Sequence, residues 1–381
     1  MARSLAAVVV VMLGLAWFVL HSMGPEVGTG DGPGGLSGER TPTLRSDVPP
    51  RAANPVGGSG APEGRADPAA ASGQPSEGDP QLALPPAPSV MPARPAPEDS
   101  AETARLTSAF ERAQALIAAG DRPAAQRLLE QTRAEAGSPA SRARSGLVLA
   151  GIVDQPAVAR TLYSEAFREG VVTGAEFEEV GRRLRQLNAD PGSSLLPNIE
   201  AGSYQVQSGD ALWNLCHKVF PKSFGVRPEV GLVKLVNGMT GDTLQVGQRL
   251  VVPTQPLTLR VDSRELGLVA FLGDQVLAAY RVGLGKEGRT PRGVFTIEVK
   301  QENPVWWKDG QAIPFGDPEN VLGTRWLGFE DRPGTSGYGI HGTAEPETIG
   351  LFRSMGCVRM RNEEVQELFE FVPRGTAVEI L

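Results

Sequence analysis

The sequence predicts a multidomain protein whose last third is mainly β, preceded by a small βααβ segment and an all-α region. Three patterns predict this fold class. Apolar residues recur at helical spacing in residues 99–190, a mixed strand and helix pattern fills 203–254, and strand-length apolar runs occupy much of 257–381. The chain before residue 99 differs in composition from all of these. It holds 16 of the 32 prolines between residues 24 and 100, with no Phe, Trp or Tyr, and cannot build a core.

Residues 1–23 predict a signal anchor or a signal peptide. Every residue from Leu5 to Leu20 is apolar or Gly, with Arg3 ahead of the run. As a helix this run would be about 24 Å long, somewhat short of a ~30 Å hydrocarbon core. No small-x-small cleavage site follows Leu20, which favours retention. We therefore expect contact with the membrane if the segment is uncleaved, and a location in the periplasm or cell envelope, anchored to the inner membrane. Residues 24–98 then form a disordered Pro/Gly-rich linker.

The all-α region predicts four or five short helices. Phe110, Ala113 and Leu116 repeat at helical spacing, and Gly120-Asp121 marks a turn. The stretch 119–131 weakly resembles a tetratricopeptide repeat, yet no second copy follows at a period of about 34 residues. An ordinary helical bundle is an equally good interpretation. Neither version indicates a function, and a protein partner for this region is left open.

Residues 204–253 combine two strand patterns with two helical ones. YQVQ (204–207) predicts a strand, Ser208-Gly209-Asp210 offers side-chain oxygens for a helix N-cap, and QRLVVP closes as a strand. Cys216 lies on an apolar helical stripe, which favours core packing over catalysis or a disulfide with Cys357. YQVQSGDALWNL, LVKLVNGM and LQVGQRLVVP resemble the landmark motifs of the LysM family. The resemblance implies a strand, two helices and a strand, and binding of glycan strands such as those of peptidoglycan.

Charge and metal-binding residues exclude several classes of function. The formal net charge is −7, which argues against nucleic acid as a partner. The chain has two Cys and three widely separated His, without a CxxC or HExxH motif. We therefore expect no metal site and no cofactor.

Residues 257–381 predict a mainly antiparallel sheet with one clear helix. The runs TLRVD, GLVAFLGD, QVLAAYRVGLG and GVFTIEVK have the length and spacing of hairpin strands. Asn362 is predicted to cap the helix, Val365, Leu368, Phe369 and Val372 to form its buried stripe, and Pro373 to end it.

One Cys and one His in this region are the minimum set for thiol catalysis. Cys357 lies in SMGCVRM, beside a glycine and two residues before Arg359, so we expect an accessible thiol. His341 is the only His of the region. An imidazolium can lower the pKa of a thiol by several units, and we expect His341 to hold Cys357 as the thiolate. On residue types alone, a structural Cys and a structural His are also open interpretations.

The motifs YGIHGTAEPETIG, SMGCVRM, TPRGVF and NVLGTRW resemble the L,D-transpeptidase catalytic domain, also called the YkuD domain. The resemblance implies Cys357 as nucleophile, His341 as base and the Gly342 carbonyl as the group that orients the imidazole. It also implies oxyanion donors at Gly356 and Cys357. Substrate contacts are expected at Arg359, Ser354 and Tyr338, with a local ion pair as the alternative for Arg359.

The resemblance implies acyl transfer on peptidoglycan stem peptides. Cys357 would displace D-alanine from an L-centre and pass the resulting thioester to an amine. An L,D-carboxypeptidase and a catalytically silent peptidoglycan-binding scaffold are the alternatives. Met355 departs from the family pattern, because a second His often stands at that position. Trp306, Trp307 and Trp326 are expected either to line the cleft or to belong to the core.

Overall fold

The computed structural model describes residues 100–189 and 199–381. The predicted membrane segment (1–23) and linker (24–98) lie outside the described residues and stay predictions. Within the described ranges, no helix combines the length and apolarity needed to cross a membrane.

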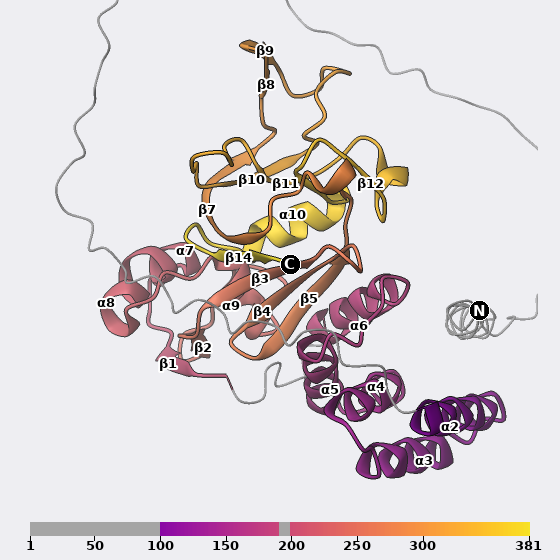
Figure 1. Cartoon of the computed structure of the whole chain (residues 1–381). Helices are drawn as coiled ribbons and strands as arrows, with labels where there is room; N and C mark the ends of the chain where they lie inside the picture. The colour runs from indigo at the N-terminus through magenta and orange to yellow at the C-terminus, as the bar shows by residue number, and fades with distance from the viewer. Residues whose placement is uncertain (1–99, 190–198) are drawn as a thin grey trace, which may run out of the picture. The chain divides into compact units, whose positions relative to one another are not determined.

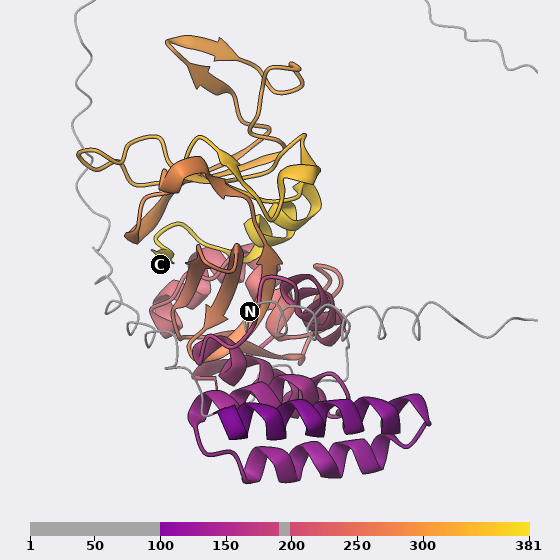
Figure 2. The same ribbon diagram turned by 45° about the vertical axis from the view of Figure 1, so that its right-hand side comes forward.

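The described part of the all-α region contains five helices (Figures 1 and 2). They are α2 (Ser100–Ala118), α3 (Arg122–Ala134), α4 (Pro139–Ala150), α5 (Pro156–Arg168) and α6 (Phe177–Ala189). Asp121 caps α3 by accepting a hydrogen bond from the N–H of Ala124, and Ser138 caps α4 in the same way through Ser141. Each of these two helices also has Pro in its first turn, a position that needs no N–H donor. The turn signal at Gly120-Asp121 is therefore also a helix start.

The LysM-like segment pairs two strands around several short helices. β1 (Ala201–Gln205) and β2 (Arg249–Pro253) are antiparallel, with Tyr204 opposite Leu250. Between them lie α7 (Leu212–Asn214), a π-helical turn η1 (Leu215–Val219), α8 (Phe220–Phe224) and α9 (Val230–Val236). Cys216 is 0% exposed in the core of this segment, and burial raises the pKa of its thiol to about 12. Both cysteines are free, so the core interpretation of Cys216 is confirmed.

Two local predictions in this segment are wrong. The first strand begins at Ala201 rather than Tyr204, and the helix that follows starts after Ala211 without a side-chain cap. Asp210 instead accepts hydrogen bonds from the N–H of Gln207 at 2.7 Å and the hydroxyl of Tyr204 at 3.0 Å. A carboxylate that closes a turn in this way is no longer available as a cap.

The C-terminal region is mainly β, as predicted, and its largest sheet has eight strands in the order β13-β11-β10-β7-β14-β3-β4-β5. The strands of this sheet are β3 (Leu257–Asp262), β4 (Gly267–Leu272), β5 (Gln275–Arg281), β7 (Gly293–Glu302), β10 (Arg325–Phe329), β11 (Gly339–His341), β13 (Val358–Arg359) and β14 (Ala377–Ile380). The pairs β14–β3 and β11–β13 are parallel, and the other neighbours are antiparallel. Two short pairs complete the region: β6 (Leu284–Gly285) with β12 (Phe352–Ser354), and β8 (Trp306–Lys308) with β9 (Gln311–Ile313).

The sheet curls around α10 (Asn362–Phe371), which lies between its two ends (Figure 1). Val365, Leu368 and Phe371 join the core of the sheet, whereas Phe369 is only half-buried. Asn362 is the first helical residue and not the cap. The cap position belongs to Arg361, which makes no capping hydrogen bond because a guanidinium has no acceptor for the helix N–H groups. The amide of Asn362 is engaged elsewhere.

The helical region and the sheet share one hydrophobic core. Side chains of β4 and β5, among them Val269, Phe271 and Val276, belong to the same buried cluster as α5 and α6. β5 is an edge strand, and edge strands expose unpaired backbone groups. Here the N–H of Val276 donates to Ser164 Oγ (2.9 Å), and buried Arg160 donates to the carbonyl of Val276 (2.8 Å). The helices thus cover both a face and the edge of the eight-stranded sheet.

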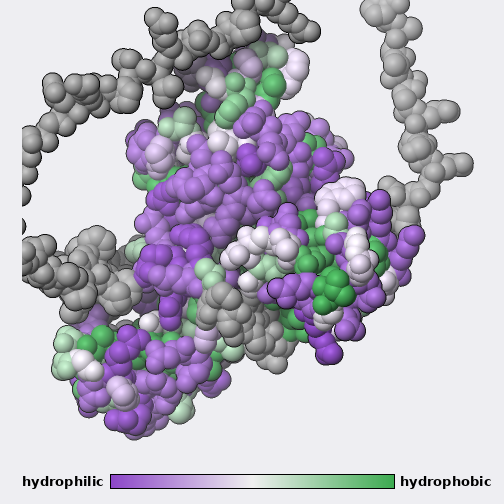
Figure 3. All heavy atoms as spheres, turned by 180° about the vertical axis from the view of Figure 1, so that it is seen from behind, coloured by the Kyte–Doolittle hydropathy of each residue, from purple (hydrophilic) through white to green (hydrophobic). Residues whose placement is uncertain are grey.

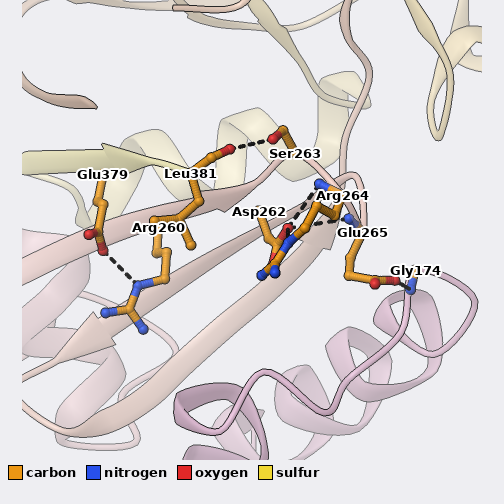
Figure 4. A network of polar contacts seen from close by, with 8 residues as sticks. All are labelled: Gly174, Arg260, Asp262, Ser263, Arg264, Glu265, Glu379 and Leu381. Carbon is orange, nitrogen blue, oxygen red and sulfur yellow. Dashed lines mark hydrogen bonds and ion pairs between the residues drawn. The ribbon is translucent and has the colours of Figure 1, made fainter. Parts of the chain in front are cut away.

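A polar network extends this contact at the turn between β3 and β4. Glu265 accepts a hydrogen bond of 2.8 Å from the N–H of Gly174, in the loop before α6 (Figure 4). On the strands beside it, Arg260 pairs with Glu379 at 2.9 Å. Seen from behind, the described surface is mostly hydrophilic, with hydrophobic side chains in smaller patches (Figure 3).

Candidate active site

Cys357 lies in a tight turn between β12 and β13 that only a glycine can complete. Gly356 has φ +147°, and a Cβ there would lie 2.4 Å from the ring of Tyr338 and 3.0 Å from the carbonyl oxygen of Arg289. The absence of a side chain lets the backbone pass between these groups. Cys357 is consequently held at a fixed place, partly exposed, next to the exposed side chain of Met355.

Ser354 stabilises this turn from beneath. Its hydroxyl donates to the carbonyl of Cys357 at 2.7 Å and accepts from the N–H of Gly356 at 3.1 Å, and the residue is 1% exposed. Because this buried hydroxyl both donates and accepts a hydrogen bond, it fixes the backbone at Gly356 and at Cys357, before and after the Cα that carries the sulfur. The geometry therefore favours a supporting role for Ser354 over the predicted contact with substrate.

His341 ends β11 and is 3% exposed. Its Nδ1 lies 2.5 Å from the carbonyl oxygen of Gly342. A carbonyl can only accept, so Nδ1 carries the proton and Nε2 of the neutral ring keeps a free lone pair. The ring of Trp326 lies beside the imidazole, with 5.9 Å between the ring centroids. The arrangement leaves Nε2 as the nitrogen that can take a proton.

Paired parallel strands bring Cys357 and His341 close together. His341 pairs with Arg359 and Ile340 with Val358, and Cys357 directly precedes β13. A residue one step before Val358 comes level with Gly339, so strand spacing and rise put the Cα atoms of Cys357 and His341 ~8 Å apart. The nearest hydrogen-bond acceptor of the thiol is the carbonyl of Gly337, 3.8 Å from Sγ. Among the described contacts there is no hydrogen bond between the sulfur and the imidazole.

Burial opposes charge on both members of the pair. It raises the pKa of Cys357 to about 11, against the opposing effects of the Gly339 backbone and the positive charge of Arg359. It also lowers the pKa of His341 to about 4, with the Gly342 carbonyl opposing and Arg359 adding to the decrease. Both shifts favour a thiol and a neutral imidazole in this geometry, because neither charge is solvated. The thiolate–imidazolium pair stays a prediction, and burial acts against it.

Arg359 forms the local ion pair that was the alternative to substrate binding. Its Nη1 lies 3.0 Å from Glu345 Oε2 and 3.4 Å from the hydroxyl of Thr348. The residue is 9% exposed, and its backbone bonds in both directions to Gly283. Arg359 therefore links β13 to the segment after His341. Its positive charge also acts to lower the pKa of the Cys357 thiol.

The remaining predicted positions differ in what they offer a substrate. The N–H of Cys357 donates no hydrogen bond within the described part of the chain, whereas that of Gly356 is directed to Ser354. Tyr338 is half-buried and packs against Gly356. The N–H of Cys357 is thus available to stabilise an oxyanion, as predicted. The N–H of Gly356 could do so only if it shared its hydrogen bond between the oxyanion and Ser354 Oγ.

The three tryptophans separate into two groups. Trp326 belongs to β10 beside His341, whereas Trp306 and Trp307 belong to β8, in the β8–β9 hairpin that projects from the sheet (Figures 1 and 2). Trp307 is 69% exposed.

The described residues contain no group of His, Cys, Asp or Glu that could hold a metal ion.

Sequence reasoning missed Asn362 as part of this site. An Asn at a helix start predicts a cap, yet its amide bonds to Thr324 and to the carbonyl of Thr343, next to the carbonyl that orients His341. The only signal in the sequence is that Thr343 directly follows Gly342. That adjacency does not reveal that Asn362 is the residue bonded to Thr343.

Comparisons with known proteins agree with the motifs. The L,D-transpeptidase catalytic domain family matches residues 257–380, and the LysM domain family matches residues 204–253. "Putative L,D-transpeptidase YqjB" of Bacillus subtilis is 45% identical over 130 residues, which cover 33% of this chain and 72% of that protein. "Putative L,D-transpeptidase YkuD" of Bacillus licheniformis is 32% identical over 184 residues, covering 46% and 97% respectively. An L,D-transpeptidase structure from Mycobacterium smegmatis has 19% identity and a TM-score of 0.29, over 36% of this chain and 64% of that one.

Proposed function

This chain belongs to the L,D-transpeptidase family, and from that premise we propose that it is a peptidoglycan L,D-transpeptidase with Cys357 as its nucleophile. One observation carries the proposal. Cys357 directly precedes β13, the parallel neighbour of the strand that His341 ends, and the proton on Nδ1 of His341 is fixed by the Gly342 carbonyl. This leaves Nε2 free to take the thiol proton.

The first half-reaction forms a thioester. Sγ of Cys357 attacks the carbonyl carbon of an L-centre bonded to D-alanine, while Nε2 of His341 accepts the proton of the thiol. The free N–H of Cys357 stabilises the resulting oxyanion, together with a shared N–H of Gly356. When the C–N bond breaks, the imidazolium returns its proton to the departing amine of D-alanine. Because the resting pair is neutral, we propose that the proton moves during the attack and not before it.

The second half-reaction transfers the acyl group to an acceptor. An amine of a second stem peptide would attack the thioester and form a 3→3 cross-link, with His341 taking a proton from the amine and returning it to the sulfur. A protein lysine as acceptor would anchor that protein to the wall, and water would make the enzyme an L,D-carboxypeptidase. The LysM segment would bind the glycan strands that carry the stem peptides and so raise the local concentration of stem peptides at the active site.

We propose that this reaction takes place in the cell envelope, in the periplasm. Residues 1–23 would hold the protein at the inner membrane, and residues 24–98 would act as the spacer between the membrane and the wall. These segments support the proposal only by their sequence pattern and composition.

Incubation of the protein with purified disaccharide tetrapeptides, followed by mass spectrometry, tests the proposal. We expect dimers that have lost one D-alanine with the wild type and unchanged substrate with Cys357→Ala. Cys216→Ala is the matched control, because Cys216 is buried in the LysM core far along the chain from the site, and it should keep the activity. Tripeptides without dimers would identify a carboxypeptidase. Unchanged substrate with the wild type would leave only the scaffold function.

A further inference from the structure

The side chain of Asn362 joins two backbone segments beside the imidazole. Its Oδ1 accepts from the N–H of Thr324 at 3.1 Å, and its Nδ2 donates to the carbonyl of Thr343 at 2.9 Å. Thr324 follows Leu322 by two residues, and Thr343 directly follows Gly342. A single amide at the start of α10 therefore connects the loop before β10 to the turn after β11.

These two segments carry the carbonyl groups that act on His341. Burial lowers the pKa of this imidazole, and the carbonyls of Gly342 and Leu322 both act in the opposite direction. The Gly342 carbonyl accepts the Nδ1 proton at 2.5 Å. The orientation of the ring thus depends on how firmly the peptide between Gly342 and Thr343 is held.

The packing around this peptide leaves no room for another arrangement. A Cβ on Gly342 would lie 2.2 Å from Oδ1 of Asn362. A Cβ on Gly323 would lie 2.4 Å from the same oxygen, 2.6 Å from the carbonyl carbon of Gly342 and 2.7 Å from the nitrogen of Thr343. Gly323 also has φ +62°, a value that favours glycine. Two glycines and one amide therefore clamp the peptide that orients His341.

We propose that Asn362 is a positioning residue of the catalytic centre, which fixes the tautomer and the direction of His341 through the Gly342 carbonyl. The inference rests on the proposed role of His341 as the base. It requires the amide in particular, since one group must accept from Thr324 and donate to Thr343 at the same time. A carboxylate can only accept, and a methyl group can do neither.

The experiment compares Asn362→Ala and Asn362→Asp with Glu363→Ala in the full-length protein. Glu363 is the next residue of the same helical turn and its side chain is exposed, so its variant controls for changes at the helix start. Labelling with 15N in histidine alone gives signals from only three residues, His21, His217 and His341. The chemical shifts of the ring nitrogens report which one carries the proton, and tetrapeptide turnover is measured on the same samples.

We expect the wild type and Glu363→Ala to show a single His341 tautomer with the proton on Nδ1. In Asn362→Ala we expect a mixture of tautomers and a kcat at least tenfold lower, with KM changed less than twofold, since small displacements at a reacting centre reduce the rate steeply. Asn362→Asp keeps the contact to Thr324 and should show a smaller change of the same kind.

An unchanged His341 tautomer in folded Asn362→Asp and Asn362→Ala would overturn the inference, even if turnover fell, because the residue would then be merely structural. If Asn362→Ala does not fold, the Asn362→Asp spectrum decides alone. A tautomer change in the variants, combined with a wild type that turns over no tetrapeptide, would support the positioning role while refuting the proposed function.

Discussion

At the scale of single residues, the proposed catalytic pair combines what the sequence predicted with what only the fold determines. The motifs around Cys357 and His341 predicted both residues as candidates, because residue type and order are local properties. Their protonation was not predictable in this way. It depends on burial, which raises one pKa and lowers the other, and burial is decided by strands and loops remote in sequence.

The neutral pair predicts how the thiol responds to pH. Alkylation by iodoacetamide needs the thiolate, so the rate for Cys357 should increase about tenfold per pH unit up to its pKa of about 11. A small free thiol with a pKa near 8.5 should level off more than two units earlier. Cys216 is buried and should not react, and intact mass after timed quenching measures the rate. A plateau at or below pH 7 would instead indicate a preformed thiolate.

The same reasoning gives the direction for catalysis in acid. His341 must be neutral to accept the thiol proton, and burial holds its pKa at about 4. The activity should therefore persist on acidification until the pH approaches that value and should then fall as the imidazole becomes protonated.

At the scale of elements, strands were better predicted than the turns that carry the chemistry. The apolar runs from residue 257 to residue 300 became β3, β4, β5 and β7 nearly as predicted, since alternation and burial are visible in the sequence. The failures at Asp210 and Asn362 have a common cause. Both side chains form hydrogen bonds that compete with capping, and in Asn362 the partners lie 19 and 38 residues away.

Substitution of Gly356 tests the importance of the turn that holds Cys357. Gly356→Ala places a methyl group 2.4 Å from the Tyr338 ring, so the turn must move. We expect a lower melting temperature and a loss of activity on the order of 100-fold. Gly288→Ala is the matched control, because Gly288 also has positive φ (+70°) but no atom within 4 Å of its Cβ position. Equal effects of the two substitutions would show that backbone strain, and not the clash, is responsible.

At the scale of the whole molecule, the helical region packs against the C-terminal sheet and shares a core with it. Its side chains fill one core with β4 and β5 and satisfy the backbone of the edge strand. The sequence predicted the helices but not this contact, since their apolar stripes do not specify which surface they cover.

A shared core predicts that helices and sheet unfold together. The helical region has no Trp, whereas the LysM and catalytic segments have four. Circular dichroism at 222 nm, which follows the helices, and Trp fluorescence should give the same denaturant midpoint. Loss of the helical signal at a lower denaturant concentration, before any change in fluorescence, would show that the region is an independent domain.

The central claim is that Cys357 carries the acyl group, and acid quenching of the protein incubated with the proposed tetrapeptide substrate tests this most directly. Intact and peptide mass spectrometry should find an adduct equal to the substrate minus D-alanine on the peptide that contains Cys357, labile to hydroxylamine as a thioester must be. Cys357→Ala should show none. Release of D-alanine at full rate by Cys357→Ala, or an adduct on any other residue of the wild type, would contradict the account.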